Sequence, residues 1–463
     1  MKFIYYILRY LQTIMSARKP SIPKGMRDFN SDVVQKRNYI LETVKSAFER
    51  YGYAPIETPA MENIETLTGK YGDEGDRLIF KILNSGDYLS KTDFNTDTNS
   101  KSLTKQIVEK ALRYDLTVPF ARFVVQNRND ITFPFKRYQM QNVWRADRPQ
   151  KGRYREFYQC DADVIGTDSL ICEVELVQLY DDVFSILNIP NVDICINNRK
   201  VLSGMIELME ATEIFDDIVI IIDKLDKIGI EKVKEEMKNK GVKESSMSML
   251  DTFLNARDIS DLEMLLEQSE VGKRGLEELQ FVMEKIDKIG LQSANLVFDI
   301  TLARGLNYYT GCILEVKAND VQLGSIGGGG RYDDLTSNFG LKDVSGVGVS
   351  FGIDRIYLVL EELELFPKNI TISTTVMFAN FGVAESSYCL PLLKQLRSAG
   401  ISSELYPQKA KMKKQMNYAD NKGIRFVVLV GENEMDSAML TVKDMNSGEQ
   451  SELNITELIK KLS

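Results

Sequence analysis

Two strand-like segments joined by a short basic turn constrain the fold of this 463-residue chain more than any other feature. The segments are "ITFPFKRYQMQNVWRAD" and "REFYQCDADVIG", and the turn between them contains "RPQKG". Strand-forming residues on both sides of a short polar connection are typical of a β-hairpin. We therefore expect a long antiparallel pair of strands with a charged tip.

The charge of the chain is unevenly distributed. The net charge is −9, which taken alone argues weakly against a nucleic-acid partner. Residues 136–155, however, contain seven basic residues and a single acid, Asp147. A local basic patch can bind phosphates even on an acidic protein, so the composition leaves an RNA partner open.

Histidine is absent, and the five cysteines are scattered without a CxxC pair. The absence of histidine excludes every catalytic triad, general base and metal site that needs an imidazole, and it argues against zinc. An odd number of scattered cysteines indicates reduced thiols, as in a cytosolic protein. We expect a cytoplasmic protein without a protein-held metal.

We expect residues 1–20 to form an N-terminal extension. The opening "MKFIYYILRYLQTI" is basic and apolar but too short to span a bilayer. A signal peptide is poorly supported because no small-residue cleavage site follows cleanly, and Met15 offers an alternative start. No other run is apolar enough for a membrane.

The remaining sequence divides by its periodicity. Residues 200–290 show helical periodicity, so we expect residues 196–290 to be a helical insertion into one domain made of residues 21–195 and 291–366. Alternating strand and helix patterns predict a separate α/β domain over residues 371–463. An amphipathic helix is expected before Gly52, and a mobile surface loop over residues 84–106, which are rich in Ser, Thr, Asn and Asp.

The segments "GSIGGGGRYDD" and "GVGVSFGIDR" are rich in glycine but match neither a P-loop nor a dinucleotide fingerprint. Tight turns and close strand packing explain the glycines alone, whereas a flat nucleotide lying on the sheet is the functional alternative. Arg145, Arg304 and Arg355 each lie in or beside an apolar run. Three such arginines suggest a shared polyanion, and phosphoryl chemistry needs positioned positive charge and Mg²⁺ more than a general base.

Four segments in this order resemble histidyl-tRNA synthetase, a class II aminoacyl-tRNA synthetase: "FERYGYAPIETP", "VWRADRPQKGRYREFYQCD", "LARGLNYYTG" with "GGGGRYDDL", and "GVGVSFGIDR". The likeness begins near Ser21, and "YADNKGIRFVVLVGENE" is similar to the family's anticodon-binding domain. The resemblance implies an α+β fold. Its antiparallel catalytic sheet would be flanked by helices, with a helical insertion and a C-terminal α/β anticodon-binding domain.

The resemblance also implies an activity and an assembly. Histidine and ATP would form histidyl-adenylate, with Mg²⁺ bridging the β- and γ-phosphates, and the histidyl group would pass to the terminal ribose of tRNA(His). The helix that ends near Tyr51, together with Pro59, would build a homodimer interface. The alternative for this helix is ordinary packing in a core.

The resemblance assigns four residues to ATP binding and one to catalysis. Arg145 with Asp147 would hold the α-phosphate, Arg153 would reach the nucleotide, and Arg355 would hold the γ-phosphate from the start of a helix. Arg304 would be the catalytic cation that stabilises charge as the histidine carboxylate attacks the α-phosphorus. Many relatives have Glu at the position of Asp147 and Asp at the position of Asn307. The alternative for Arg355 is an ion pair on the helix surface with Asp354 or Glu361.

The resemblance likewise builds a histidine pocket. A neutral imidazole offers one donor and one acceptor, and Tyr309 and Asp163 would meet them. Tyr308 would wall the pocket, and Arg304 would face the amino acid as well as the nucleotide. Because side chains alternate along a regular strand, we expect only Tyr309 of the paired tyrosines to point into the pocket. The residues expected at the α-amino group are Asp115, Thr117 and Gln159.

Two basic segments are expected to contact tRNA. By resemblance, Arg148 and Gln150 in the basic turn would face the extra 5′ guanosine of tRNA(His). Lys411, Lys413 and Lys414 would contact phosphates of the anticodon stem. The alternative for both segments is a solvated surface.

The rival interpretation is a non-catalytic regulatory paralogue, like the regulatory subunit of ATP phosphoribosyltransferase. Such proteins keep the histidine pocket but lack the nucleotide motifs and the anticodon domain. Arg145, Arg355 and the region after Thr371 argue against this alternative.

Overall fold

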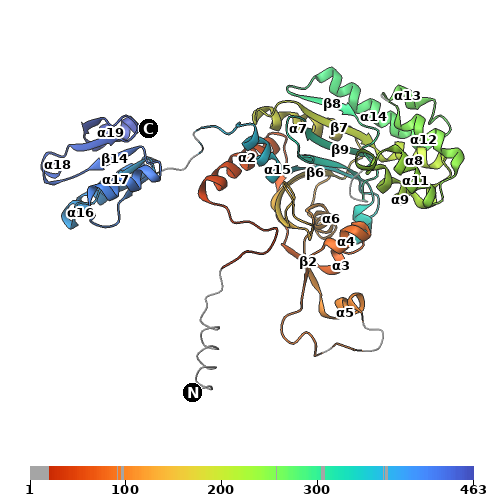
Figure 1. Cartoon of the computed structure of the whole chain (residues 1–463), viewed down its shortest axis with the longest axis horizontal. Helices are drawn as coiled ribbons and strands as arrows, with labels where there is room; N and C mark the ends of the chain where they lie inside the picture. Colours follow the sequence, from red (N-terminus) through yellow and green to blue (C-terminus); the bar gives the residue numbers. More distant parts are fainter. Residues whose placement is uncertain are drawn as a thin grey trace, which may run out of the picture. The chain divides into compact units, whose positions relative to one another are not determined.

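The computed structural model describes residues 20–90, 92–94, 99–256, 258–303, 308–368, 370 and 374–462 (Figure 1). Most of the expected N-terminal extension lies outside these residues, and so do Arg304 and Asn307. The chain forms two compact units, divided between Pro367 and Lys368. Each unit has its own hydrophobic core and is described by itself below.

An eight-stranded sheet with the order β1-β5-β6-β11-β10-β9-β7-β8 is the framework of the first unit. The six central strands pair antiparallel, and the outer strands β1 and β8 pair parallel with their neighbours. The strands are β1 Ala54–Pro55, β5 Phe135–Trp144, β6 Glu156–Ile165, β7 Val192–Asn198, β8 Ala294–Phe298, β9 Cys312–Ala318, β10 Gly327–Tyr332 and β11 Gly346–Gly352.

The predicted hairpin is confirmed as the pair β5 and β6. Its register runs from Phe135 opposite Ile165 to Trp144 opposite Glu156, and the basic turn connects the two strands. Ten residues in each strand make this the longest pairing in the sheet. The strands on either side, β1 and β11, pair with β5 and β6 of this hairpin.

Three helices cover one face of the sheet: α2 Ser31–Arg50, α7 Ile171–Ile186 and α15 Ile353–Glu362. The helix expected before Gly52 is confirmed as α2, which begins where the Asn30 side chain accepts a hydrogen bond from the Val33 amide. Phe48 of α2 and Tyr180 of α7 pack on Phe351 of β11, with ring centroids 5.7 Å and 4.8 Å apart. Aromatic packing therefore fixes both helices on the central strands.

A small sheet of the order β2-β4-β3 lies beside α6, Thr117–Gln126. The loop expected over residues 84–106 projects from this sheet (Figure 1). The expectation is wrong from Ser100 onward, because α5 occupies Ser100–Ile107. Asn99 and Ser102 cap α5 reciprocally, which starts a helix in a polar sequence. The other elements here are β2 Met61–Asn63, α3 Ile64–Leu67, α4 Gly72–Leu78, β3 Lys81–Ile82 and β4 Lys110–Leu112.

A helical block occupies the chain between β7 and β8, at the end of the sheet away from α2 (Figure 1). Its apolar side chains belong to the same buried cluster as those beneath the sheet. At its exit, Asp181 of α7 accepts hydrogen bonds from the amides of Gln292, Ser293 and Ala294. The helices are α8 Arg199–Leu208, α9 Phe215–Ile222, α10 Leu225–Ile228, α11 Ile230–Asn239, α12 Met247–Leu254, α13 Ser260–Glu263 and α14 Glu270–Ile289.

The second unit is an α/β domain, as its alternating pattern predicted. Strands β13 Ser403–Leu405, β12 Val376–Phe378 and β14 Phe426–Leu429 are parallel. The hairpin of β15 Leu440–Asp444 and β16 Gln450–Leu453, which the sequence analysis did not predict, completes the sheet. The helices are α16 Val383–Ser398, α17 Met412–Asn421, α18 Glu432–Ser437 and α19 Ile455–Leu462. In the described parts of both units, no helix has the length and apolar character needed to cross a bilayer.

The glycine run of β10 leads to a test of strand packing. A β-carbon at Gly329 would lie 2.2 Å from the carbonyl oxygen of Gly348, so the two backbones would have to separate. We expect Gly329→Ala to lower the free energy of unfolding by about 1–3 kcal/mol in chemical denaturation.

Gly328→Ala is the matched control. The nearest atom to a β-carbon at Gly328 is the Leu314 carbonyl oxygen at 3.5 Å, so its stability should stay within about 0.5 kcal/mol of the parent. Equal losses in the two variants would contradict this account of the glycine run.

Candidate active site

One face of the main sheet carries polar and small residues where β5, β6, β11 and β10 run side by side. The strand register places these residues in three rows, and we call this surface the polar face. The first row is Arg137, Asp163, Gly348 and Gly330, the second is Gln139, Asp161, Ser350 and Gly328, and the third is Gln141, Gln159 and Gly352. Since strand residues alternate between faces, the apolar neighbours of these residues face the helices.

The glycines of β10 and β11 make room for side chains on the polar face. A β-carbon at Gly348 would lie 2.0 Å from Oδ1 of Asp163, and one at Gly330 would lie 2.9 Å from Cδ1 of Tyr309. At Gly328 the nearest described atom to such a β-carbon, chain neighbours aside, is the Leu314 carbonyl oxygen at 3.5 Å. Close packing therefore explains most of the glycine run, and at Gly328 no described side chain fills the space above the second row.

Asp163 is buried and lies at the centre of the first row. Its Oδ2 forms an ion pair with Nη2 of Arg137 at 2.7 Å, and its Oδ1 accepts a hydrogen bond from the Tyr332 hydroxyl at 2.6 Å. Burial raises the pKa of Asp163, and the guanidinium of Arg137 opposes the rise. The carboxylate is thus fixed in position by two buried partners.

Asp161 lies in the second row and has an unpaired oxygen. Burial raises its pKa to about 7, against the opposing charge of Arg137 and with help from Asp163. Among the described residues its Oδ1 has no hydrogen-bond partner, and the same holds for the buried Oε1 atoms of Gln139 in this row and Gln159 in the next. Buried polar atoms are nearly always paired, so three acceptors without a described partner on one face indicate a place for a donor from a ligand.

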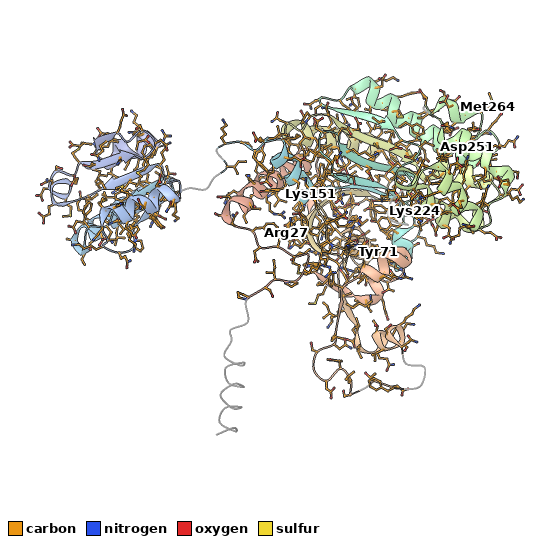
Figure 2. The ribbon with its side chains drawn as sticks, viewed as in Figure 1. Arg27, Tyr71, Lys151, Lys224, Asp251 and Met264 are labelled. Carbon is orange, nitrogen blue, oxygen red and sulfur yellow. The ribbon has the colours of Figure 1, made fainter. Side chains whose placement is uncertain are left out.

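Asp115 and Thr117 lie close to Tyr308. The Asp115 carboxylate accepts hydrogen bonds from the Tyr71 hydroxyl at 2.8 Å (Tyr71 is labelled in Figure 2), the Val118 amide at 3.2 Å and the Tyr308 hydroxyl at 3.1 Å. Thr117 also hydrogen-bonds Tyr308. Burial raises the pKa of Asp115, and these hydrogen bonds oppose the rise.

Both Tyr308 and Tyr309 face the group of buried carboxylates. They lie before the start of β9 at Cys312, with their rings edge to face and the centroids 5.0 Å apart. Burial raises the pKa of Tyr309, as do the nearby charges of Asp163, Asp161 and Asp115. The regular strand assumed for the two tyrosines is not present, because β9 begins only at Cys312, so strict alternation does not apply to them. Which tyrosine contacts the ligand stays a prediction.

Arg145 lies at the edge of the polar face, beside Asp115. Its Nε donates a hydrogen bond to the Tyr114 carbonyl at 3.0 Å, and its guanidinium stacks 4.2 Å from the Tyr114 ring centroid. Its charge lowers the pKa of Asp115. Arg145 is therefore near both the carboxylate cluster and the basic turn that follows it.

The basic turn holds Asp147 and Arg153 as a loose pair, with 3.7 Å between Oδ1 and Nη1. Arg355 at the start of α15 also contacts this turn, donating from Nε to the Gly152 carbonyl at 3.0 Å. Its Nη1 donates to the Ser325 carbonyl at 2.6 Å. The acids named as alternative partners of Arg355 bind other cations: Asp354 pairs with Arg27 and Arg37, and Glu361 with Lys36.

The residues expected to contact tRNA are exposed. Arg148 and Gln150 lie in the basic turn of the first unit. Lys411 precedes α17 of the second unit, and Lys413 and Lys414 lie in its first turn. The catalytic cation named by the resemblance, Arg304, lies outside the described residues.

The sequence analysis missed Arg137, Gln139 and Asp161 as site residues. The signal was present, because Gln159, Asp161 and Asp163 are spaced by two residues, as are Arg137, Gln139 and Gln141. Two polar stripes of this period in a hairpin predict one polar face.

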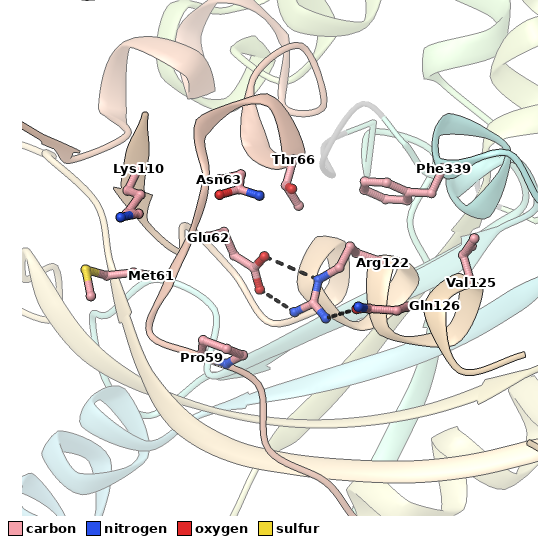
Figure 3. Close-up of a pocket in the computed structure, with 10 residues that line it drawn as sticks. All are labelled: Pro59, Met61, Glu62, Asn63, Thr66, Lys110, Arg122, Val125, Gln126 and Phe339. Carbon is pink, nitrogen blue, oxygen red and sulfur yellow. Dashed lines mark hydrogen bonds and ion pairs between the residues drawn. The ribbon is translucent and has the colours of Figure 1, made fainter. Parts of the chain in front are cut away.

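The expected interface residue Pro59 is one of the residues that line a separate hollow of about 630 Å³ (Figure 3). Arg122 spans it, with its guanidinium hydrogen-bonded to both Glu62 and Gln126. The other lining residues are Met61, Asn63, Thr66, Lys110, Val125 and Phe339.

Comparisons with known proteins extend over both units. A family model described as histidyl-tRNA synthetase matches residues 101–356, and one described as an anticodon binding domain matches residues 372–463. The histidine–tRNA ligase of Christiangramia forsetii is 58% identical over 450 residues, which are 96% of this chain and 99% of that protein. That of Phocaeicola vulgatus is 53% identical with the same coverage.

A solved structure agrees with the sequence relatives. The crystal structure of histidyl-tRNA synthetase from Nostoc sp. PCC 7120 matches with a TM-score of 0.78 and 31% identity, covering 96% of this chain and 99% of that one. Sequence and fold therefore agree along nearly the whole length, and the chain belongs to the histidyl-tRNA synthetase family.

Proposed function

We propose that the chain joins L-histidine to tRNA(His) in two steps. The histidine carboxylate attacks the α-phosphorus of ATP, pyrophosphate leaves, and the histidyl group of the adenylate then passes to the terminal ribose of tRNA. As a member of its family, the chain is an aminoacyl-tRNA synthetase, a ligase that uses ATP. The observation that best supports this proposal is that Asp115, Asp161 and Asp163 lie close to the paired tyrosines at the polar face.

In this proposal Tyr309 and Asp163 bind the imidazole, and Tyr308 walls the pocket. The fixed position of Asp163 supports this assignment, because a carboxylate locked by Arg137 and Tyr332 can orient a ring N–H. A wrong amino acid would leave such buried groups unpaired. Selectivity for histidine follows from that cost.

Asp115, Thr117 and Gln159 bind the α-ammonium group, and we add Asp161 to this set. Three donors of an ammonium need three acceptors. Asp115 already accepts three hydrogen bonds from the protein, whereas Oδ1 of Asp161 and Oε1 of Gln159 accept none from the part of the chain that the structure describes. The unpaired oxygens on the second and third rows are thus the better acceptors for a cation.

The nucleotide is held by arginines around the basic turn. Arg145 with Asp147 binds the α-phosphate, Arg153 reaches the nucleotide and Arg355 binds the γ-phosphate. Arg304 stabilises the charge that develops at the α-phosphorus and lies beside the histidine carboxylate. The carbonyl contacts of Arg145 and Arg355 support these roles, since they hold the guanidinium groups at the edge of the polar face and at the turn.

Mg²⁺ enters as part of the substrate, bridging the β- and γ-phosphates of ATP. Among the described residues there is no group of three or more carboxylates or thiols that could hold a metal ion. The donors that do surround the expected nucleotide position are guanidinium groups, which suit the phosphates rather than a metal. The ion would neutralise charge on the leaving pyrophosphate.

The chain binds tRNA, as the match to an anticodon-binding domain indicates. We propose that Arg148 and Gln150 contact its acceptor end and that Lys411, Lys413 and Lys414 contact anticodon-stem phosphates. We also propose that the chain works in the cytoplasm as a homodimer with α2 and Pro59 at the interface. The exposure of the basic residues and of Pro59 supports these assignments.

A regulatory paralogue is the disfavoured alternative. The close relatives are histidine–tRNA ligases that match the chain over 96% of its length, and the region after residue 371 matches an anticodon-binding domain. Histidine-dependent exchange of pyrophosphate into ATP tests the choice directly. A chain that binds histidine but catalyses no exchange would be a regulator.

Arg304→Ala tests the catalytic cation. Removing a charge that acts on the transition state should lower the exchange rate by about 10²–10³-fold while ATP binding changes far less. The measurement is steady-state pyrophosphate exchange together with the dissociation constant of ATP. Near-normal exchange by this variant would refute the role.

Asp161→Asn tests the added ammonium ligand. Loss of a hydrogen bond to a charged group should raise KM for histidine by about 10–100-fold, with KM for ATP unchanged. The same change should stabilise the unliganded protein, because it removes a buried and partly unpaired carboxylate. Ser350→Ala, which removes only a neutral partner, is the control.

The pH dependence has a definite sign. The pKa of Asp161 rises from its ordinary value of 3.8 to about 7 on folding, so its ionisation costs the folded state stability as pH rises between those values. The gain in unfolding free energy of Asp161→Asn should therefore be larger at pH 8 than at pH 5. A variant that is destabilised and keeps the parent KM would make Asp161 a structural residue.

The salt dependence of binding tests the lysines at α17. Replacing Lys411, Lys413 and Lys414 by Gln should flatten the slope of log affinity for tRNA against log salt by about one per lost phosphate contact. Pyrophosphate exchange needs no tRNA and should be unchanged. An unaltered slope would mean that these lysines do not contact tRNA and are only part of the solvated surface.

A further inference from the structure

The chain on both sides of residues 304–307 is held from the end of β7 and the start of α8. Asn197 donates from Nδ2 to the carbonyl oxygens of Ile300 at 3.2 Å and Leu302 at 3.0 Å. Arg199 donates from Nη1 to the Ala303 carbonyl at 3.0 Å and from its main-chain amide to the Gly311 carbonyl at 2.8 Å. One residue thus binds both ends of the segment 303–311.

Stability alone does not account for Arg199. Its side chain is buried, with the residue 5% exposed, and its guanidinium forms no ion pair with any described residue. Burial lowers its pKa, and the charge of Asp216 opposes this only from a distance. Burying a cation without a paired anion costs free energy that an apolar side chain would avoid. This cost in free energy accompanies a hydrogen bond from Arg199 to the carbonyl of Ala303, the residue before Arg304.

The far end of the same segment is tied to a second rigid group. The Thr310 hydroxyl donates to Oδ2 of Asp333 at 2.7 Å, and the Thr310 amide donates to the Arg331 carbonyl at 2.8 Å. Arg331 in turn forms a buried two-pronged ion pair with Glu173 of α7, at 2.5 Å and 2.7 Å. The end of the segment at Thr310 is therefore fixed independently of Arg199.

We propose that Arg199, assisted by Asn197, is a positioning residue for adenylate formation. By fixing the Ala303 and Gly311 carbonyls, it sets where the chain enters and leaves the segment that carries Arg304, Tyr308 and Tyr309. This inference rests on the proposed function of these three residues. Small misplacements of reacting groups cost rate far more than binding, so the effect falls on the chemical step.

The inference also gives the helical block a link to the reaction. Arg199 is the first residue of α8, and its guanidinium lies 5.2 Å from the ring centroid of Phe215 in α9. The residue that holds the catalytic segment is thus seated in the block. A shift of α8 relative to β7 would move both carbonyl anchors together.

The test compares Arg199→Gln, Arg199→Lys and Asp181→Asn in the full chain. Asp181 is a matched control because it is another buried side chain that binds main-chain groups, at the opposite junction of the helical block. We expect Arg199→Gln to lower kcat of pyrophosphate exchange by about 10–100-fold, with KM for ATP within about twofold of the parent. Lysine can still donate to the Ala303 carbonyl and should restore most of the rate.

Stability and local protection separate positioning from general damage. Both Arg199→Gln and Asp181→Asn should lower Tm, but only Arg199→Gln should lower kcat and speed hydrogen exchange of the Ala303 and Thr310 amides, which are hydrogen-bonded in the structure. Parent-like kcat and protection in Arg199→Gln would overturn the inference, as would equal loss of kcat in Asp181→Asn. If the parent chain itself catalysed no exchange, the proposed function would fail, and amide protection would still decide the role of Arg199.

Discussion

Charge buried on a rigid sheet is the constraint on which the first unit depends. Asp115, Asp161 and Asp163 lie within one small region, and Arg137 is the fully buried cation among them. Moving such groups out of water costs several kcal/mol per ion unless each is closely paired. The long hairpin and the helices packed beneath it provide the stiffness that keeps these charges in place without their collapsing onto one another.

The arrangement explains why the polar face consists of acids and glycines together. Asp163 can pair with Arg137 and Tyr332 only because Gly348 leaves its carboxylate room. In the same way, the absence of a side chain at Gly330 lets Tyr309 lie against it. If the proposed histidine pocket lies here, its selectivity for an amino acid with a polar ring depends on backbone packing as much as on the side chains assigned to contact the ligand.

Much of this architecture follows from periodicity. The β5–β6 hairpin, α2 and the alternating elements of the second unit come from apolar spacing and turn residues. Periodicity did not predict helix α5, because its polar sequence has no apolar period. The start of α5 depends on the reciprocal cap between Asn99 and Ser102. The strand assumed at the paired tyrosines was wrong, because strand-forming residues do not mark where a strand begins. Asp161 is not one of the motif positions, and it is found only through the polar stripe of Gln159, Asp161 and Asp163 that contains it.

The contact between Gly348 and Asp163 has a consequence for redesign of the pocket. The two positions share one volume, so neither can be altered freely while the other stays as it is. A larger residue on β11 becomes possible only if the acid on β6 is shortened, and shortening the acid alone leaves a void beside a buried guanidinium. Libraries that aim to charge other amino acids should therefore vary this pair jointly, as a single unit.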